Sequence, residues 1–89
     1  MALRQLEIVN QKGLHARASA KFVECVEQFD ANAIVRKGGM DAAGDSIMGL
    51  LMLAAAKGST IEVETKGAEA DALADALEHL VADRFGEGV

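Results

Sequence analysis

The chain has 89 residues, of which 51% are hydrophobic and only 3% aromatic, and its formal net charge is −5 at pH 7. This length suits one compact domain over residues 1–89, with a core of aliphatic side chains, methionine and alanine. The acidic charge argues against nucleic acid as a partner. It also makes any locally basic site more informative, because such a site opposes the overall field.

The sequence carries no sign of export or of a membrane span. The N-terminal stretch MALRQLEIVNQKG has no uninterrupted apolar segment of the kind found in signal peptides. The longest apolar run, residues 47–56, is about ten residues long and too short to cross a bilayer. We therefore expect a cytoplasmic protein that does not insert into a membrane.

The first half of the chain predicts a strand, a helix and a hairpin. Apolar and polar residues alternate over residues 3–9, which indicates a strand. Apolar residues then recur every three or four positions over residues 16–29, which indicates a helix. Residues 33–37 and 40–42 are predicted as short strands joined at a Lys-Gly-Gly turn.

The second half predicts a helix, a strand and a longer helix. The first helix covers residues 47–55, after a capping residue at Ser46 and before a Lys-Gly pair. Strict alternation in TIEVETK predicts a strand over residues 60–66 with one polar face. A leucine stripe predicts a helix over residues 68–84, and the two glycines that follow predict a loose tail. The order βαββαβα with one polar sheet face predicts an α+β, two-layer open-faced sandwich.

His15 stands at the predicted start of the first helix, where histidine is an unusual choice. The N–H groups of a first helical turn lack intrahelical partners, so those near Ala16, Arg17 and Ala18 form an anion site. The Arg17 guanidinium can offer two donors to a phosphate group. Histidine forms covalent intermediates near neutral pH. The pattern therefore favours a phosphoryl acceptor and donor, and a surface histidine beside a solvated arginine is the alternative.

Two stretches of the chain, GLHARASAKFV and GDSIMGLLMLAAAKG, resemble known motifs. The first is similar to the active-site signature of HPr, the histidine-containing phosphocarrier of the bacterial phosphoenolpyruvate-dependent phosphotransferase system. The resemblance covers the whole chain and implies a four-stranded antiparallel sheet with three helices on one face. It implies that His15 is phosphorylated and that Arg17 is its phosphate-side partner. It also implies a carrier of phosphoryl groups rather than an enzyme with its own substrate pocket.

The same resemblance implies protein partners. Phosphorylated Enzyme I would supply the phosphoryl group to His15, and downstream acceptors would take it. Those acceptors are sugar transport components or a regulatory branch resembling the nitrogen-related phosphotransferase system. The apolar helix at residues 47–55 and Asp45 favour the regulatory branch. We expect a monomer that needs no metal or organic cofactor.

Ser46 has two compatible interpretations. It caps the predicted helix, and the resemblance implies a regulatory phosphosite for an HPr kinase/phosphorylase. Asp45 departs from the basic or neutral residue that many relatives carry there, and its carboxylate would repel a phosphoserine. An alternative function is a regulatory binding module with an HPr-like fold controlled through Ser46. Such relatives typically lose the histidine, whereas His15 and Arg17 are both present here.

The helix after Ser46 has no charged residue before Lys57. Ile47, Leu50 and Leu51 can face the sheet, while Met48 and Met52 point elsewhere. A surface helix without a polar face predicts a covering partner, and methionine suits surfaces that meet several partners. The predicted docking patch beside His15 consists of Ile47, Met48, Leu51 and Met52. The alternative is a helix that is more completely buried.

Three further features receive plain structural interpretations. Cys25 is alone, so it forms no intrachain disulfide, and its apolar neighbours indicate a small buried residue. His79 lies on the last helix without a nearby cluster and is interpreted as a surface or boundary histidine. The segment around Ser46 also resembles the attachment motif of acyl carrier proteins. The strand at residues 60–66 and the GLHARA segment argue against that alternative, because acyl carriers are all-helical.

Overall fold

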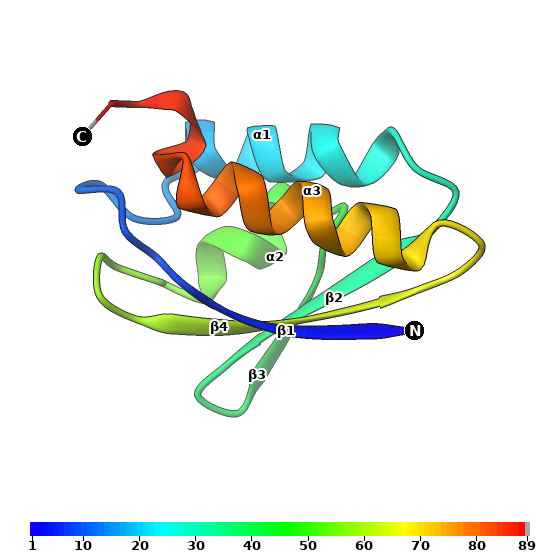
Figure 1. The fold of residues 1–89 in the computed structure, drawn as a ribbon. Helices are drawn as coiled ribbons and strands as arrows, with labels where there is room; N and C mark the ends of the chain where they lie inside the picture. Colours follow the sequence, from blue (N-terminus) through cyan, green and yellow to red (C-terminus); the bar gives the residue numbers. More distant parts are fainter. Residues whose placement is uncertain (89) are drawn as a thin grey trace.

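The computed structural model describes residues 1–88, which form two layers (Figure 1). In chain order the elements are β1 (Ala2–Glu7), α1 (Ala16–Glu27), β2 (Asn32–Lys37), β3 (Met40–Ala43), α2 (Ile47–Met52), β4 (Thr60–Lys66), α3 (Ala70–Ala82) and the 3-10 turn η1 (Arg84–Gly86). This confirms the predicted order βαββαβα. Within residues 1–88, no helix is both long enough and apolar enough to cross a membrane.

The four strands form one antiparallel sheet in the order β1-β4-β2-β3. On the central strand β4, every second residue from Ile61 to Thr65 is buried. On its other face, the Arg36 guanidinium donates to Glu62 at 3.2 Å and to Glu64 at 2.9 Å. One sheet face therefore builds the core, while the other meets water through ion pairs of small individual stability. The sheet also rules out the all-helical acyl-carrier alternative.

The three helices lie on the same side of the sheet and close the core (Figure 1). Phe22 from α1, Leu50 from α2 and Leu77 from α3 are all fully buried. They pack in one cluster with the inward side chains of the sheet, including Val63. Burying a side chain of this size stabilises the fold by about 1.5–3 kcal/mol. The core therefore fixes the helix ends from which the site is built.

The helix α2 ends at Met52, so the predicted end at residue 55 is wrong. Ala54 has a positive φ of 51°, and the Ala55 carbonyl accepts the Leu14 N–H at 2.9 Å. A run of alanines has a high helix propensity, which is why the sequence predicts a longer helix. The contact with the loop before α1 overrides that propensity and takes the chain out of the helix.

Other predicted boundaries differ by two residues or fewer. The strand β1 covers Ala2–Glu7 rather than residues 3–9, although Ile8 still exchanges backbone hydrogen bonds of 2.8 Å with Gly58 and Ser59. The helices α1 and α3 both end two residues earlier than predicted, at Glu27 and Ala82. These ends move because local turns replace the last helical hydrogen bonds.

The segment after α3 forms a C-terminal hook, defined here as residues 84–87, instead of the predicted loose tail. Arg84, Phe85 and Gly86 have consecutive positive φ angles of 56°, 54° and 76°. Phe85 is fully buried, and its carbonyl accepts the Lys21 ammonium at 2.6 Å. Burial of the phenyl ring offsets the cost of the left-handed backbone. The hook turns the chain back towards the start of α1.

Candidate functional site

The loop before α1 is positioned by a close backbone approach at Gly13. Its φ is +67°, and a Cβ at this position would lie 2.6 Å from the Ala55 carbonyl oxygen. The buried Asn10 side chain donates its amide to the Gly13 carbonyl at 2.8 Å. Glycine is therefore required here for packing and backbone conformation.

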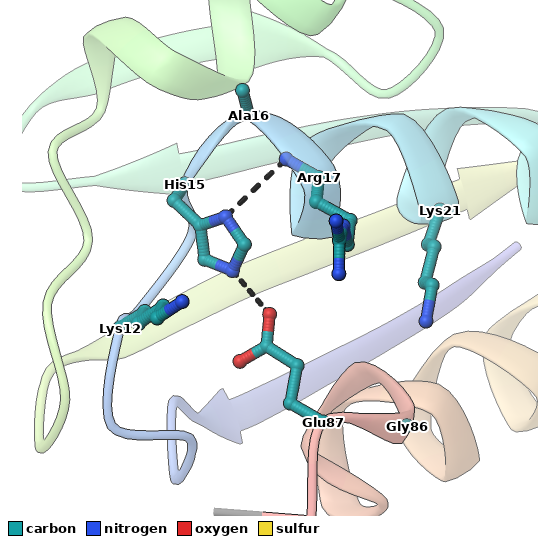
Figure 2. Close-up of a pocket in the computed structure, with 7 residues that line it drawn as sticks. All are labelled: Lys12, His15, Ala16, Arg17, Lys21, Gly86 and Glu87. Carbon is teal, nitrogen blue, oxygen red and sulfur yellow. Dashed lines mark hydrogen bonds and ion pairs between the residues drawn. The ribbon is translucent and has the colours of Figure 1, made fainter.

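His15 is the N-cap of α1. Its backbone is extended, and Nδ1 accepts the Arg17 N–H at 3.3 Å (Figure 2). The His15 carbonyl accepts the Ser19 N–H at 2.8 Å and so begins the helix. Because the Arg17 amide can only donate, Nδ1 carries the lone pair. The ring thus replaces the usual capping oxygen and presents an unprotonated nitrogen at the helix start.

The second ring nitrogen of His15 meets a residue that sequence reasoning missed. The Glu87 carboxylate pairs with Nε2 through Oε2 (Figure 2). Its Oε1 accepts the Asn10 amide at 2.9 Å. Only 11% of the Glu87 side chain is exposed. Burial raises the pKa of Glu87, but the hydrogen bonds from Asn10 and His15 and the charge of Lys12 outweigh it. The pKa therefore lies below its usual value, and the group is a carboxylate at neutral pH.

The imidazole lies in a hollow with a basic lining (Figure 2). The residues that line it are Lys12, His15, Ala16, Arg17, Lys21, Gly86 and Glu87. Three cations thus surround one carboxylate in a chain whose net charge is −5. Within residues 1–88, the Arg17 guanidinium forms no ion pair. This local field attracts an anionic group to the face of His15.

The first turn of α1 adds backbone donors to the same place. Arg17 donates its N–H to the ring, whereas the N–H groups of Ala16 and Ala18 have no hydrogen-bond acceptor within residues 1–88. No acidic side chain lies in this turn. The predicted set of Ala16, Arg17 and Ala18 is therefore gathered at one helix start. Unpaired N–H groups and the helix dipole favour a negatively charged group there.

Ser46 caps α2 as predicted, since its Oγ accepts the Gly49 N–H at 3.0 Å. The adjoining α2 patch contains the four predicted docking residues Ile47, Met48, Leu51 and Met52. Ile47, Met48 and Met52 are 40%, 69% and 67% exposed, and Leu51 is half-buried. Of the three residues expected to face the sheet, Leu50 is fully buried, Leu51 is half-buried and Ile47 is the most exposed. The exposed Met48 and Met52 therefore lie on the helix that Ser46 caps.

The remaining candidate residues lie outside the hollow. His79 is exposed on α3, as predicted for a surface histidine. Cys25 is half-buried against the core, and burial raises the pKa of its thiol, which favours the neutral form. Across residues 1–88, no three His, Cys, Asp or Glu side chains gather in a way that could hold a metal ion. The chemistry of the site thus centres on His15.

Comparison with known proteins decides the family. Residues 3–83 match the family model PTS-HPr, described as the PTS HPr component phosphorylation site. The chain belongs to the HPr family of phosphocarrier proteins of the phosphotransferase system. This HPr-family chain is 49% identical over 88 residues to the Phosphocarrier protein HPr of Neisseria meningitidis serogroup A, covering 99% of both chains. It is 43% identical to the Phosphocarrier protein NPr of Shewanella violacea, covering 94% of this chain and 92% of that one.

A solved HPr structure confirms the fold of this HPr-family chain. The crystal structure of HPr-C-His from Thermoanaerobacter tengcongensis superposes with a TM-score of 0.94 at 31% identity, over 100% of both chains. The resemblance of GLHARASAKFV to the HPr signature is therefore confirmed at the level of family and fold. The matched segment ends at residue 83, before the C-terminal hook and Glu87.

Proposed function

We propose that this chain works in the bacterial cytoplasm as a carrier that accepts a phosphoryl group on His15 and passes it on. The observation that carries the proposal is the lone pair on Nδ1 at a helix start inside a basic hollow. The donor is the phosphohistidine of Enzyme I. The acceptors are downstream phosphotransferase-system proteins, either sugar transport components or members of a nitrogen-related regulatory branch.

In the proposed transfer, the Arg17 N–H releases its hydrogen bond to Nδ1, and the freed Nδ1 lone pair attacks phosphorus in line. A phosphorus–nitrogen bond forms at His15 while the bond to the donor nitrogen breaks, and the electron pair of the broken bond stays on the donor. The phosphoryl oxygens would reach the unpaired N–H groups of Ala16 and Ala18 and the free Arg17 guanidinium. The same contacts serve the reverse attack by an acceptor. The protein emerges unchanged, so it is a covalent carrier.

The α2 patch is the proposed docking surface for donor and acceptors. It presents exposed Met48 and Met52, and the segment that follows α2 is tied to the His15 loop through the hydrogen bond from the Leu14 N–H to the Ala55 carbonyl. Partners that cover this patch would therefore be placed next to His15. We expect Met48→Glu to lower kcat/KM with Enzyme I by about tenfold, the effect of losing about 1.4 kcal/mol of contact energy. Unchanged transfer kinetics in this variant would refute the docking role.

Ser46 is the proposed regulatory phosphosite. A phosphate on its Oγ would place charge at the start of α2, beside the α2 patch, and would alter docking. The exposed carboxylate of Asp45 lies next to it and would repel that phosphate. Treatment with an HPr kinase/phosphorylase, followed by mass mapping, tests whether the serine is modified. Phosphate found on any residue other than Ser46 would overturn this assignment.

The carrier role is tested by incubating the protein with phosphoenolpyruvate and Enzyme I. Intact mass is measured before and after mild acid treatment, with His15→Ala as the control. We expect one added phosphate that is lost in acid and absent from the variant. No added phosphate with an active Enzyme I would overturn the proposal and direct attention to the regulatory alternative at Ser46. We also expect a monomer, and sedimentation would test it.

A further inference from the structure

Glu87 and Asn10 form a hydrogen-bonded relay behind the His15 ring. The buried Asn10 amide donates to Glu87 Oε1 at 2.9 Å, Glu87 Oε2 pairs with His15 Nε2, and the opposite ring nitrogen accepts the Arg17 N–H at 3.3 Å. The Asn10 amide also donates to the Gly13 carbonyl at 2.8 Å. The relay thus joins residues that lie 72 positions apart in the sequence.

The direction of each hydrogen bond in the relay fixes where the imidazole proton sits. A backbone amide can only donate, so Nδ1 is the acceptor. A carboxylate can only accept, so Nε2 carries the proton. The Asn10 amide in turn can only donate to the carboxylate. These three constraints agree on one tautomer of neutral His15, with the proton on Nε2 and the lone pair on Nδ1.

The geometry points to Glu87 as a positioning residue for phosphoryl transfer, held in place by Asn10. We infer that it keeps the imidazole in the Nε2–H tautomer, so that Nδ1 is the nucleophile. It then faces the positive charge that the ring gains when a phosphoryl group bonds to Nδ1. This inference rests on the proposed function of His15. In the step, the bond to phosphorus forms at Nδ1, the donor's phosphorus–nitrogen bond breaks, and the imidazole proton stays on Nε2.

The surroundings of Glu87 indicate a built position rather than a chance contact of a chain end. Phe85 is fully buried two residues before it, and the Lys21 ammonium binds the Phe85 carbonyl at 2.6 Å. The carboxylate is mostly buried and has a partner on each oxygen. Lys12, Arg17 and Lys21 line the same hollow and supply the opposing charge.

The substitution Glu87→Gln makes a sharp test because its amide has one acceptor and one donor atom. The Asn10 amide requires the acceptor oxygen, so the new NH₂ group would face Nε2 and donate to it. Nε2 would then have to carry the lone pair, and the proton would move to Nδ1. We expect ring ¹⁵N NMR at alkaline pH to show mainly Nε2–H in the natural protein and a shift towards Nδ1–H in Glu87→Gln.

Two further variants separate the relay from a simple charge effect. Asn10→Asp removes the donor to Glu87 and adds repulsion, so it should move the tautomer balance away from Nε2–H. Asp83 is an exposed residue at the start of η1, and its side chain makes no capping hydrogen bond there. The control Asp83→Asn removes this carboxylate and should leave the His15 tautomer balance unchanged. Thermal melting of each variant checks that it is folded. An unchanged tautomer balance in folded Glu87→Gln would overturn the inference.

Transfer kinetics supply the second readout. We expect kcat/KM for phosphoryl transfer from phosphorylated Enzyme I to fall about tenfold in Glu87→Gln, as for other residues that orient a reacting imidazole. Glu87→Asp retains the carboxylate and should recover part of the rate. An equal loss in Asp83→Asn would overturn the positioning role. The tautomer is measured without any donor, so failure of phosphorylation in the natural protein would overturn only the proposed function.

Discussion

The helices α1 and α2 both begin at a side-chain N-cap, but the two capping side chains differ in the further contacts that they make. Gly13-Leu14-His15 leads into α1, and Gly44-Asp45-Ser46 leads into α2. The Ser46 hydroxyl accepts one N–H at 3.0 Å and forms no other hydrogen bond within residues 1–88. The His15 ring also accepts an N–H, but its other nitrogen reaches Glu87 in a basic hollow. The two caps therefore differ in one respect: serine has a single side-chain polar atom, whereas histidine has a second ring nitrogen that can bind its own partner.

The largest expected effect comes from giving α1 the cap of α2. His15→Ser retains a good N-cap side chain but removes the nucleophile. We expect complete loss of acid-labile phosphate uptake from phosphorylated Enzyme I, while the melting temperature stays near that of the natural protein. Intact mass and circular dichroism measure the two properties. Uptake of acid-labile phosphate by this variant would show that the difference between the two caps is not functional.

The glycines that precede the two caps should differ in their tolerance of alanine. A Cβ on Gly13 would lie 2.6 Å from a backbone oxygen at a φ of +67°, whereas a Cβ on Gly44 would lie 2.8 Å from the Ala33 methyl group without a positive φ. We expect Gly13→Ala to lower the free energy of unfolding by about 3 kcal/mol, and Gly44→Ala by about 1–2 kcal/mol. Urea titration measures both. A reversed order would contradict the packing described for the loop.

Removal of the Ser46 cap should affect stability alone. Ser46→Ala leaves the Gly49 N–H without its acceptor, and we expect the free energy of unfolding to fall by about 1 kcal/mol. Phosphoryl transfer through His15 should proceed at an unchanged rate, because the serine is not part of the hollow. Rate measurements of phosphoryl transfer from phosphorylated Enzyme I to the variant test this. A loss of transfer that exceeds the loss of stability would make Ser46 part of the chemistry.

The smallest expected effect is a dependence of stability on pH that the serine cap lacks. The pKa of Glu87 is lower in the folded chain than its unfolded value of about 4.3, so folding favours the carboxylate. Its contribution is fully present above the unfolded pKa and is lost as the pH falls through the folded pKa. We expect the difference in unfolding free energy between the natural protein and Glu87→Gln to shrink in acid. A difference that grows below about pH 4 would contradict this sign.

Periodicity predicted the fold, whereas contacts between distant segments decided what it missed. The strand at residues 60–66 was predicted at both ends, because each of its residues alternates between core and water. The helix predicted to residue 55 stops at Met52 because of a contact with the loop at Leu14, which no local pattern contains. Charge and helix position predicted the gathering of His15 and Arg17.

Glu87 could not be predicted by the same means. It lies between Gly86 and Gly88 in a segment that reads as a loose tail, and its partner lies 72 positions away. The available signal is Phe85, a large apolar residue in a tail that has no periodicity. Such a residue indicates that the chain end returns to the core, although it does not say which polar group the next residues meet.

The close approach at Gly13 has a consequence for how this chain can vary among its homologues. The atoms that exclude a Cβ at this position are the Ala55 carbonyl oxygen and the Ala56 Cα, at 2.6 and 2.9 Å, and both belong to the backbone. Every residue that could replace Ala55 or Ala56 carries the same atoms. We therefore expect that no second substitution makes room for a first one, and that position 13 has no covarying partner among homologues. It should stay glycine even where the side chains around it change freely.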